Sequence, residues 1–271
     1  MNFYNDSDPD KCRWLEKLIA AQAIPPGVVS STPIQDLRPS DLVGFTQCHF
    51  FAGIAGWSLA LELANWPAYV PIWTGSCPCQ PFSITGKKQT SLDARDLWIH
   101  FYDLISQCRP SIIFGEQVAS PDGRQWFSRV RSDLEDHSYA VGCADLCSAG
   151  IGSPHKRQRL HWVADTYGTR PQGHPWDEAE SLQLGLFNSV AAGHLGAPGG
   201  RDFWSNFGVL PYRSAKVRFE PSSLPLAHGI PARVGRLHGY GDAINPVLAA
   251  HFIHSYLLAR SEAILAPHLA D

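Results

Sequence analysis

The sequence is poor in charge and contains no long apolar run. No stretch reaches the roughly 18 consecutive apolar residues that read as a membrane-spanning helix, so we expect no membrane span. The first residues lack a basic segment followed by an apolar core, so we expect no secretory signal peptide. The net charge of −3 argues against a broadly basic protein that coats nucleic acid, although a local basic surface is compatible with it.

The cysteines lack the pattern of a disulfide framework. There are 7 of them, an odd number, and their spacing is irregular, which favours reduced thiols in a cytosolic protein. Cysteines and histidines that could be considered as metal ligands also lack zinc-site spacing, so we expect no metal. Those considered are Cys143, Cys147, His155 and His161.

A thiol held between prolines is the most informative feature that is present. In the run Thr74–Ser83, Pro78 and Pro81 fix φ on both sides of Cys79. Such a stiff loop suits a nucleophile held at one point of a cleft. It suits a disulfide poorly, because Cys77 is too close for an ordinary bridge. A lone Cys79 would more often be a buried structural cysteine, so its partners decide the interpretation.

Two downstream segments supply such partners. Residues 110–115 predict a short buried strand that leads to Glu116, and open α/β sheets place ligand groups at strand ends. Further on, Arg157 and Arg159 alternate on an extended segment and would share one face. Alone, these residues would be read as a surface charge and a solvated basic run.

Together, the three segments resemble motifs of the DNA cytosine-5 methyltransferase family. The runs around Cys79, Glu116 and Arg157 are similar, in order, to Pro-Cys-Gln, Glu-Asn-Val and Gln-x-Arg-x-Arg, with Gln117 and His155 as departures. The resemblance covers residues 75–163. It implies that Cys79 attacks C6 of a flipped cytosine and that Glu116 polarises the ring at N3 and N4.

The same resemblance implies contacts to the base and to DNA. Arg157 and Arg159 would face O2 of the base and nearby phosphates, because arginine binds such oxygens well. Three further residues of these motifs are expected to contact DNA. They are Gln80, Ser83 and Lys156.

A glycine-containing turn resembles the first motif of the family, Phe-x-Gly-x-Gly-Gly, which cradles S-adenosylmethionine. Residues 47–57 predict a strand, a tight turn and the start of a helix that continues over 58–64, and Ala55 replaces one glycine. The backbone of this loop would approach the methionine part of the cofactor. The expected cofactor contacts are Phe51, Ala52, Gly53, Gly56 and Trp57.

The spacing from this loop to Cys79 is too short for the usual family order. Residues 3–9 and the helix predicted over 12–19 resemble the second motif, and residues 26–29 resemble the third. We therefore expect a permuted chain, in which the second and third strand units precede the first. The alternative is an N-terminal helical extension with no cofactor role.

Several expected cofactor contacts depart from the family. Asp6, or alternatively Asp8, would bind the ribose where Glu is usual, and Val28 stands where Asp normally accepts the adenine amino hydrogen bond. The run 241–246 resembles Gly-Asn-Ala-Val-x-Pro, with Ala243 retained and Asp242 in place of Asn. These changes predict weakened binding of S-adenosylmethionine.

The expected fold is α/β, a Rossmann-like methyltransferase sheet with permuted strand order and a small irregular target-recognition lobe. Residues 1–165 would form the catalytic domain, with permuted cofactor motifs in 1–45 followed by 46–165. Residues 166–225 would form the lobe, and 226–271 a DNA-contacting segment and a helix over 243–259 that returns to the catalytic domain. Further elements expected are helices over 97–108 and 122–134 and a strand over 139–147.

A basic stretch is the candidate surface for DNA phosphates. Residues 201–240 contain six basic residues against two acidic ones. The predicted contacts are Arg213, Lys216, Arg233 and Arg236.

The preferred interpretation is a cytoplasmic DNA cytosine-5 methyltransferase of a bacterial or phage-infected cell. It would use S-adenosylmethionine without a metal and act on DNA as a monomer. One alternative keeps the Cys79 adduct but deaminates cytosine or transfers another group without S-adenosylmethionine, an idea motivated by Val28 and Asp242. The other alternative is a catalytically inactive DNA-binding protein.

Overall fold

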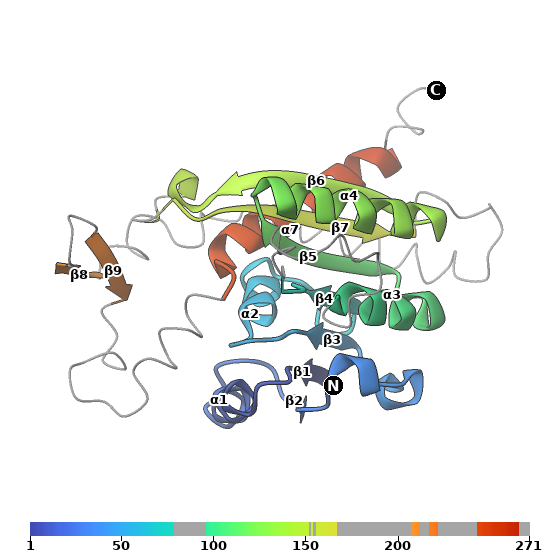
Figure 1. Cartoon of the computed structure of the whole chain (residues 1–271), viewed down its shortest axis with the longest axis horizontal. Coiled ribbons are helices and arrows are strands. Elements are labelled where there is room, and N and C mark those ends of the chain that lie inside the picture. The colour runs from blue at the N-terminus through green and yellow to red at the C-terminus, as the bar shows by residue number, and fades with distance from the viewer. Residues whose placement is uncertain are drawn as a thin grey trace, which may run out of the picture.

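A computed structural model shows a three-layer α/β arrangement (Figure 1). The structure describes residues 1–78, 96–151, 153, 156–166, 207–211, 217–221 and 243–265; side chains are described except in 207–211, 217–221 and 261–265. No helix within these ranges is long and apolar enough to cross a membrane.

Seven strands form the central sheet, in the spatial order β2-β1-β3-β4-β5-β7-β6. Strands β2, β1, β3, β4 and β5 run parallel, whereas β7 is antiparallel to both of its neighbours. The bounds are β1 Asn2–Asn5, β2 Gly27–Ser30, β3 Gln47–Phe50, β4 Ile72–Gly75, β5 Ile112–Val118, β6 Ala140–Cys147 and β7 Gln158–Asp165.

This order confirms the predicted permutation. In doubly wound sheets the chain usually enters at a central strand and moves outward, giving 3-2-1-4-5. Here the strand beside β4 is the third in the chain, and the first two strands lie outside it. Strand β1 pairs in register with β3 along its length, from Asn2 opposite Gln47 to Asn5 opposite Phe50. The N-terminal segment is therefore an integral edge of the sheet and not an extension.

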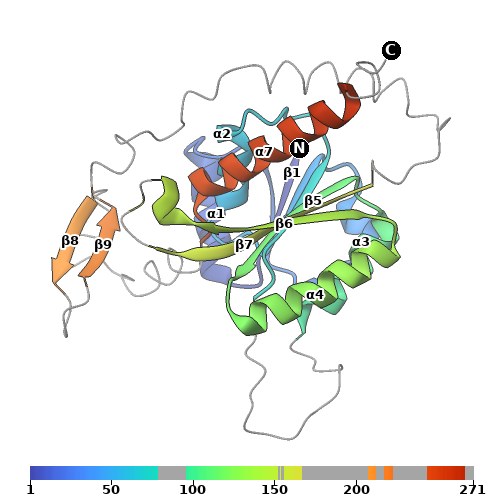
Figure 2. The same cartoon turned by 90° about the horizontal axis from the view of Figure 1, so that it is seen from above.

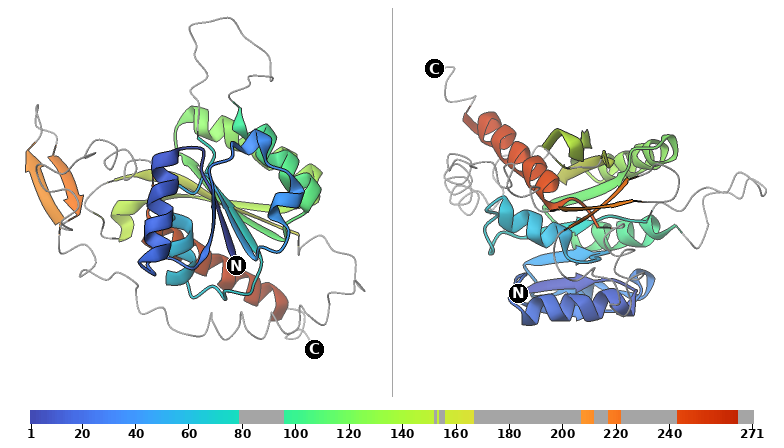
Figure 3. Two further views of the ribbon diagram at one scale, coloured as in Figure 1. Left: turned by 90° about the horizontal axis from the view of Figure 1, so that it is seen from below. Right: turned by 90° about the vertical axis from the view of Figure 1, so that its left-hand side faces the viewer.

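Helices cover both faces of the sheet (Figures 2 and 3). Helices α1, α2 and α7 lie on one face, and α3 and α4 on the other. The helices predicted over 97–108 and 122–134 are confirmed, and the C-terminal helix packs against α2. The bounds are α1 Pro9–Ala20, α2 Gly56–Leu63, α3 Leu97–Cys108, α4 Pro121–Asp136 and α7 Pro246–Leu265, with short 3-10 helices η1 Ile34–Asp36, η2 Pro39–Leu42 and η3 Ser148–Ile151.

Aromatic side chains fill the core beneath α3 and α4. Trp98 lies edge-on to Trp126 at 5.7 Å and to Trp162 at 6.3 Å between ring centroids. On α4, Trp126, Val130 and Leu134 recur at helical spacing and are all buried. This packing holds β5, which carries Glu116, against β7, which carries Arg159 and begins directly after Arg157.

The expected lobe is described only in part. Strands β8 (Phe207–Pro211) and β9 (Val217–Pro221) form a separate antiparallel pair. The domain boundaries predicted from the sequence stay predictions.

Candidate active site

A cavity of about 440 Å³ opens at the carboxyl ends of the parallel strands. Open α/β sheets bind ligands at this edge, where the strand order reverses. Its walls come from the residues after β1, the glycine loop after β3, residues 76–78, the end of β5, the arginines beside β7 and the segment before α7. It therefore joins the residues predicted for the cofactor with most of those predicted for the base.

The tight turn after β3 passes through left-handed backbone conformations. Gly53 adopts φ +57°, and Ala55 adopts φ +63° just before α2. The left-handed region costs a residue with a Cβ atom about 1–2 kcal/mol, so Ala55 holds a glycine conformation under strain. The predicted contacts Phe51, Ala52, Gly53, Gly56 and Trp57 all line the cavity.

Asp6 ties the two permuted segments together. Its carboxylate is buried, accepts a hydrogen bond from the Gly53 amide at 2.9 Å, and accepts another from the Asp8 amide at 3.0 Å. Asp8 is exposed, caps α1 by accepting from the Asp10 amide at 2.8 Å, and also lines the cavity. Both carboxylates therefore stand beside the glycine loop.

Val28 is the described cofactor candidate that the structure does not bring to this site. It lies within β2, is 44% exposed, and is not part of the cavity wall. Its proposed role at the adenine stays a prediction.

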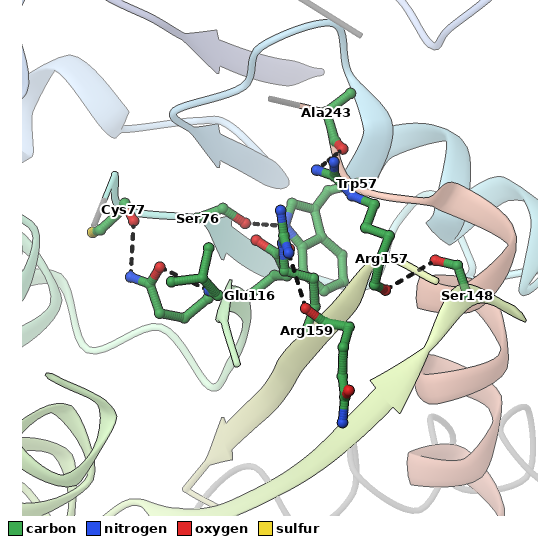
Figure 4. Close-up of polar contacts among 11 residues, drawn as sticks. Trp57, Ser76, Cys77, Glu116, Ser148, Arg157, Arg159 and Ala243 are labelled. Carbon is green, nitrogen blue, oxygen red and sulfur yellow. Dashed lines mark hydrogen bonds and ion pairs between the residues drawn. The ribbon is translucent and has the colours of Figure 1, made fainter. Parts of the chain in front are cut away.

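Glu116 is a buried acid beside an arginine (Figure 4). It is 7% exposed, and its Oε1 lies 2.7 Å from Nε of Arg159. Burial raises the pKa of Glu116 above its ordinary value, whereas the charges of Arg159 and Arg157 oppose the rise. The net rise favours a carboxyl group that keeps its proton and can donate it.

The two arginines make different contacts. Arg159 pairs with Glu116, whereas Nη2 of Arg157 donates to the carbonyl of Ala243, which precedes α7. Both side chains line the cavity. Lys156 is exposed and is not part of the cavity wall, so its expected contact with DNA stays a prediction.

The sequence analysis missed two contacts that shape the cavity. Nε1 of Trp57 donates to Oγ of Ser76 at 3.0 Å, and Nε2 of Gln117 donates to the carbonyl of Cys77 at 3.2 Å. These bonds join segments that are distant in the sequence. One hint of the second contact was present in the sequence: Gln117 departs from the asparagine of the family motif.

Cys77 is a buried thiol that is poorly suited to act as a nucleophile. Its side chain is buried, and burial raises the pKa of the Cys77 thiol well above the ordinary range. Such a thiol stays protonated and is a poor nucleophile.

His161 is a buried neutral residue behind the cavity. It lies opposite Glu116 in the β5–β7 pairing, and its ring is edge-on to Trp57 at 6.2 Å. Burial lowers the pKa of His161 to about 4. The described residues contain no cluster of three or more His, Cys, Asp or Glu that could hold a metal.

Several predicted site residues lie outside the described residues, and their roles stay predictions. They are Cys79, Gln80, Ser83, Arg213, Lys216, Arg233, Arg236 and Asp242.

The fold and the cavity define a doubly wound α/β protein with a ligand site that joins a glycine loop to a buried acid. Comparison with known proteins finds a family model that matches part of the chain. Residues 67–183 match the sequence model described as C-5 cytosine-specific DNA methylase. This match supports the resemblance to DNA cytosine-5 methyltransferases over those residues.

Curated relatives agree with this result. The chain is 34% identical over 125 residues to the type II methyltransferase M.AplI of Arthrospira platensis, covering 45% of this chain and 34% of that protein. It is 24% identical over 167 residues to the type II methyltransferase M.HhaI of Haemophilus parahaemolyticus, covering 47% and 51%. The chain thus spans about a third to a half of the length of these relatives.

A solved structure with a similar fold is that of a Spodoptera frugiperda DNMT2 mutant. The TM-score is 0.40 and the identity 17%, with 64% of this chain and 52% of that one covered.

Proposed function

We propose that this protein is a DNA cytosine-5 methyltransferase that acts through a covalent bond between Cys79 and C6 of cytosine. The observation that supports the proposal is a cavity lined both by the glycine loop and Asp6 and by Glu116 and Arg159. Methyl transfer to a base needs a cofactor and a polarised ring side by side.

The residues present fit S-adenosylmethionine. The cavity volume of about 440 Å³ lies in the range of roughly 300–1,000 Å³ typical of small-molecule sites. Asp6, or alternatively Asp8, would accept hydrogen bonds from ribose hydroxyls, and Gly53 and Gly56 would let the backbone approach the ligand closely. When bound, the cofactor supplies an electrophilic methyl group.

The residues of the chain would then act on a cytosine that has left the helix stack, because C5 and C6 are unreachable inside the duplex. The Cys79 thiolate forms a bond to C6, and the proton of Glu116 moves to N3, so that C5 becomes an enamine carbon. Arg159 holds the carboxyl group of Glu116 in place. After methylation a base removes the C5 proton, the ring returns its N3 proton, and the C6–S bond breaks to release Cys79.

DNA would meet the protein through the expected lobe and the basic stretch. The proposed phosphate contacts are those predicted from the sequence, and the domain limits are proposed as 1–165, 166–225 and 226–271. The chain as a whole has a net charge of −3, but residues 201–240 are locally basic. We therefore propose that this stretch contacts the DNA phosphates.

The comparisons give no support to the deaminase alternative, since the named relatives are methyltransferases. The inactive alternative is disfavoured because the sequence keeps Cys79, Glu116, Arg157 and Arg159 together.

The function is tested by expressing the protein in cells that lack cytosine methylation. Sequencing of their DNA should reveal 5-methylcytosine at a defined motif. The Cys79→Ala variant, expressed at the same level, should leave the DNA unmodified. C-to-T changes without methylation, or no modification of any DNA by the unchanged protein, would overturn the proposal.

A further inference from the structure

Residues just before α7 form a wall of the cavity that comes from a distant part of the chain. Ala243 and Ile244 line the cavity. Asn245 caps α7, since its Oδ1 accepts from the amides of Val247 at 3.1 Å and Leu248 at 3.2 Å. The position of this wall is therefore coupled to the start of α7, where residues 247–250 are buried.

The wall lies directly against the glycine loop. A Cβ atom added at Gly56 would come within 2.7 Å of Cγ1 of Ile244, so the two segments are in close contact. Any outward shift of residues 243–245 would widen the cavity on the side where the glycine loop would hold the cofactor.

Arg157 reaches this wall from the opposite direction (Figure 4). Its guanidinium donates to the carbonyl of Ala243. Its own backbone carbonyl accepts from the amide and the hydroxyl of Ser148, both at 3.3 Å. Arg157 is thus anchored beside β7 and η3, and its side chain bridges to the segment before α7.

Arg159 offers a natural contrast. It lies two residues further along the same strand edge and lines the same cavity, but its guanidinium pairs with Glu116. The two arginines have the same charge and similar positions, yet one contacts the acid and the other contacts the cavity wall. Replacing each arginine in turn therefore tests one contact at a time.

We infer that Arg157 is a positioning residue for the cofactor cavity: it holds Ala243–Asn245 against the glycine loop and so strengthens binding of S-adenosylmethionine in the absence of DNA. Charged donors make stronger hydrogen bonds to carbonyls than neutral ones do. The identity of the ligand rests on the proposed function. The role differs from the base and phosphate contact that the sequence motif implies.

The first test needs no ligand. Hydrogen exchange is measured over residues 243–250 in the full chain, in Arg157→Met and in the matched variant Arg159→Met. Because Arg157 holds the segment, Arg157→Met should speed exchange at the amides of the first turn of α7. Arg159→Met should keep the exchange rate of the unchanged protein there.

The second test is calorimetric titration with S-adenosylmethionine without DNA. Loss of a charge-assisted hydrogen bond that orders the wall predicts about tenfold weaker binding by Arg157→Met. Arg157→Lys, which keeps a charged donor, should bind with an affinity between the two. Arg159→Met should remain within about threefold of the unchanged protein.

Unchanged exchange in Arg157→Met, or an equal loss of affinity in the two methionine variants, would overturn the inference. If Arg157→Met does not fold, Arg157→Lys and Arg159→Lys replace the methionine pair in both measurements. If the unchanged protein binds no S-adenosylmethionine, the proposed cofactor is wrong, and the exchange comparison still decides whether Arg157 holds the wall.

Discussion

The pKa of the Glu116 carboxyl group is subject to two opposing effects. Burial favours the neutral carboxyl group, whereas Arg159 and Arg157 favour the carboxylate. In the proposed reaction, a neutral Glu116 near N3 would donate a proton as the thiol adds to C6, and Arg159 would keep the acid oriented. This balance is the chemical centre of the site.

Replacing Glu116 with Gln should therefore lower the methylation rate by about 10²–10⁴-fold, the usual range for a positioned proton donor. The fold should survive, because the side chain keeps its size. Single-turnover methylation measures the change. Glu135→Gln, at an exposed position of α4, serves as the control and should keep the normal rate. Near-normal turnover of Glu116→Gln would show that another group polarises the ring.

His161 should make stability depend on pH. Its pKa is lowered from 6.5 to about 4 in the folded protein, so below pH 6.5 the unfolded chain binds a proton that the folded chain rejects. The free energy of unfolding should therefore fall on acidification from pH 6.5 to about 4, by up to roughly 1.4 kcal/mol per pH unit for this group.

The variant His161→Phe should remove this one-proton part of the slope, because phenylalanine fits between the rings of Trp57 and Phe252 without titrating. Denaturant unfolding between pH 4 and 7 measures it. The remaining slope should include His49, whose pKa burial lowers to about 3. An unchanged slope in His161→Phe would contradict the assignment.

At the scale of elements, the backbone of β5 at Gly115 lies so close to the ring of Trp162 that no Cβ atom fits between them. A Cβ atom at Gly115 would lie 2.1 Å from Cζ2 of Trp162, whereas one at Gly142 on β6 would meet its nearest atom at 3.7 Å. Gly115→Ala should thus destabilise the protein by roughly 1–3 kcal/mol through overpacking. Gly142→Ala, the matched control, should change stability by less than about 0.5 kcal/mol. Equal thermal unfolding of the two variants would contradict this.

The elements show which features a sequence can predict. Helix α3 has the predicted bounds, because its apolar spacing is local and Asp96 caps its first turn by accepting from the Trp98 amide. The left-handed turn at Ala55 could not be predicted, because an alanine adopts it only where the fold compensates for the strain.

The sequence predicted which residues belong to the candidate site but not which of them contact each other. Motif order identified Glu116 and both arginines. The bond from Arg157 to Ala243 joins residues 86 positions apart, and no local pattern encodes such a contact. Val28 lies within β2, is 44% exposed and does not line the cavity, so its proposed contact with adenine stays a prediction.

At the scale of the whole molecule, the permutation preserves the spatial arrangement while changing the order of the chain. Motif spacing alone predicted it, because the segment between the glycine loop and Cys79 is too short for two further strand units. The Asp6–Gly53 bond shows the consequence: an acid from the N-terminal segment reaches the same glycine loop. The cavity depends on which strands are neighbours, not on which comes first.

The basic stretch, residues 201–240, should strengthen binding to DNA of any base sequence. Arg233→Ala and Arg236→Ala should each weaken binding to all DNA sequences alike and lower the salt slope by about one, since each removes one phosphate contact. Arg131→Ala, on the exposed side of α4, should leave the slope unchanged. Filter binding over a salt series measures it, and an altered site preference with a normal slope would argue for base contacts instead.

The most direct test of the account is the covalent bond to cytosine. The protein is incubated with S-adenosylmethionine and duplex DNA that carries 5-fluorocytosine, and the complex is resolved under denaturing conditions. The unchanged protein and Cys77→Ser should form a DNA complex that survives denaturation, because the Cys77 thiol is buried and protonated. Cys79→Ser should form none. A stable complex with Cys79→Ser, or its loss in a folded Cys77→Ser, would contradict the assignment of Cys79 as the nucleophile.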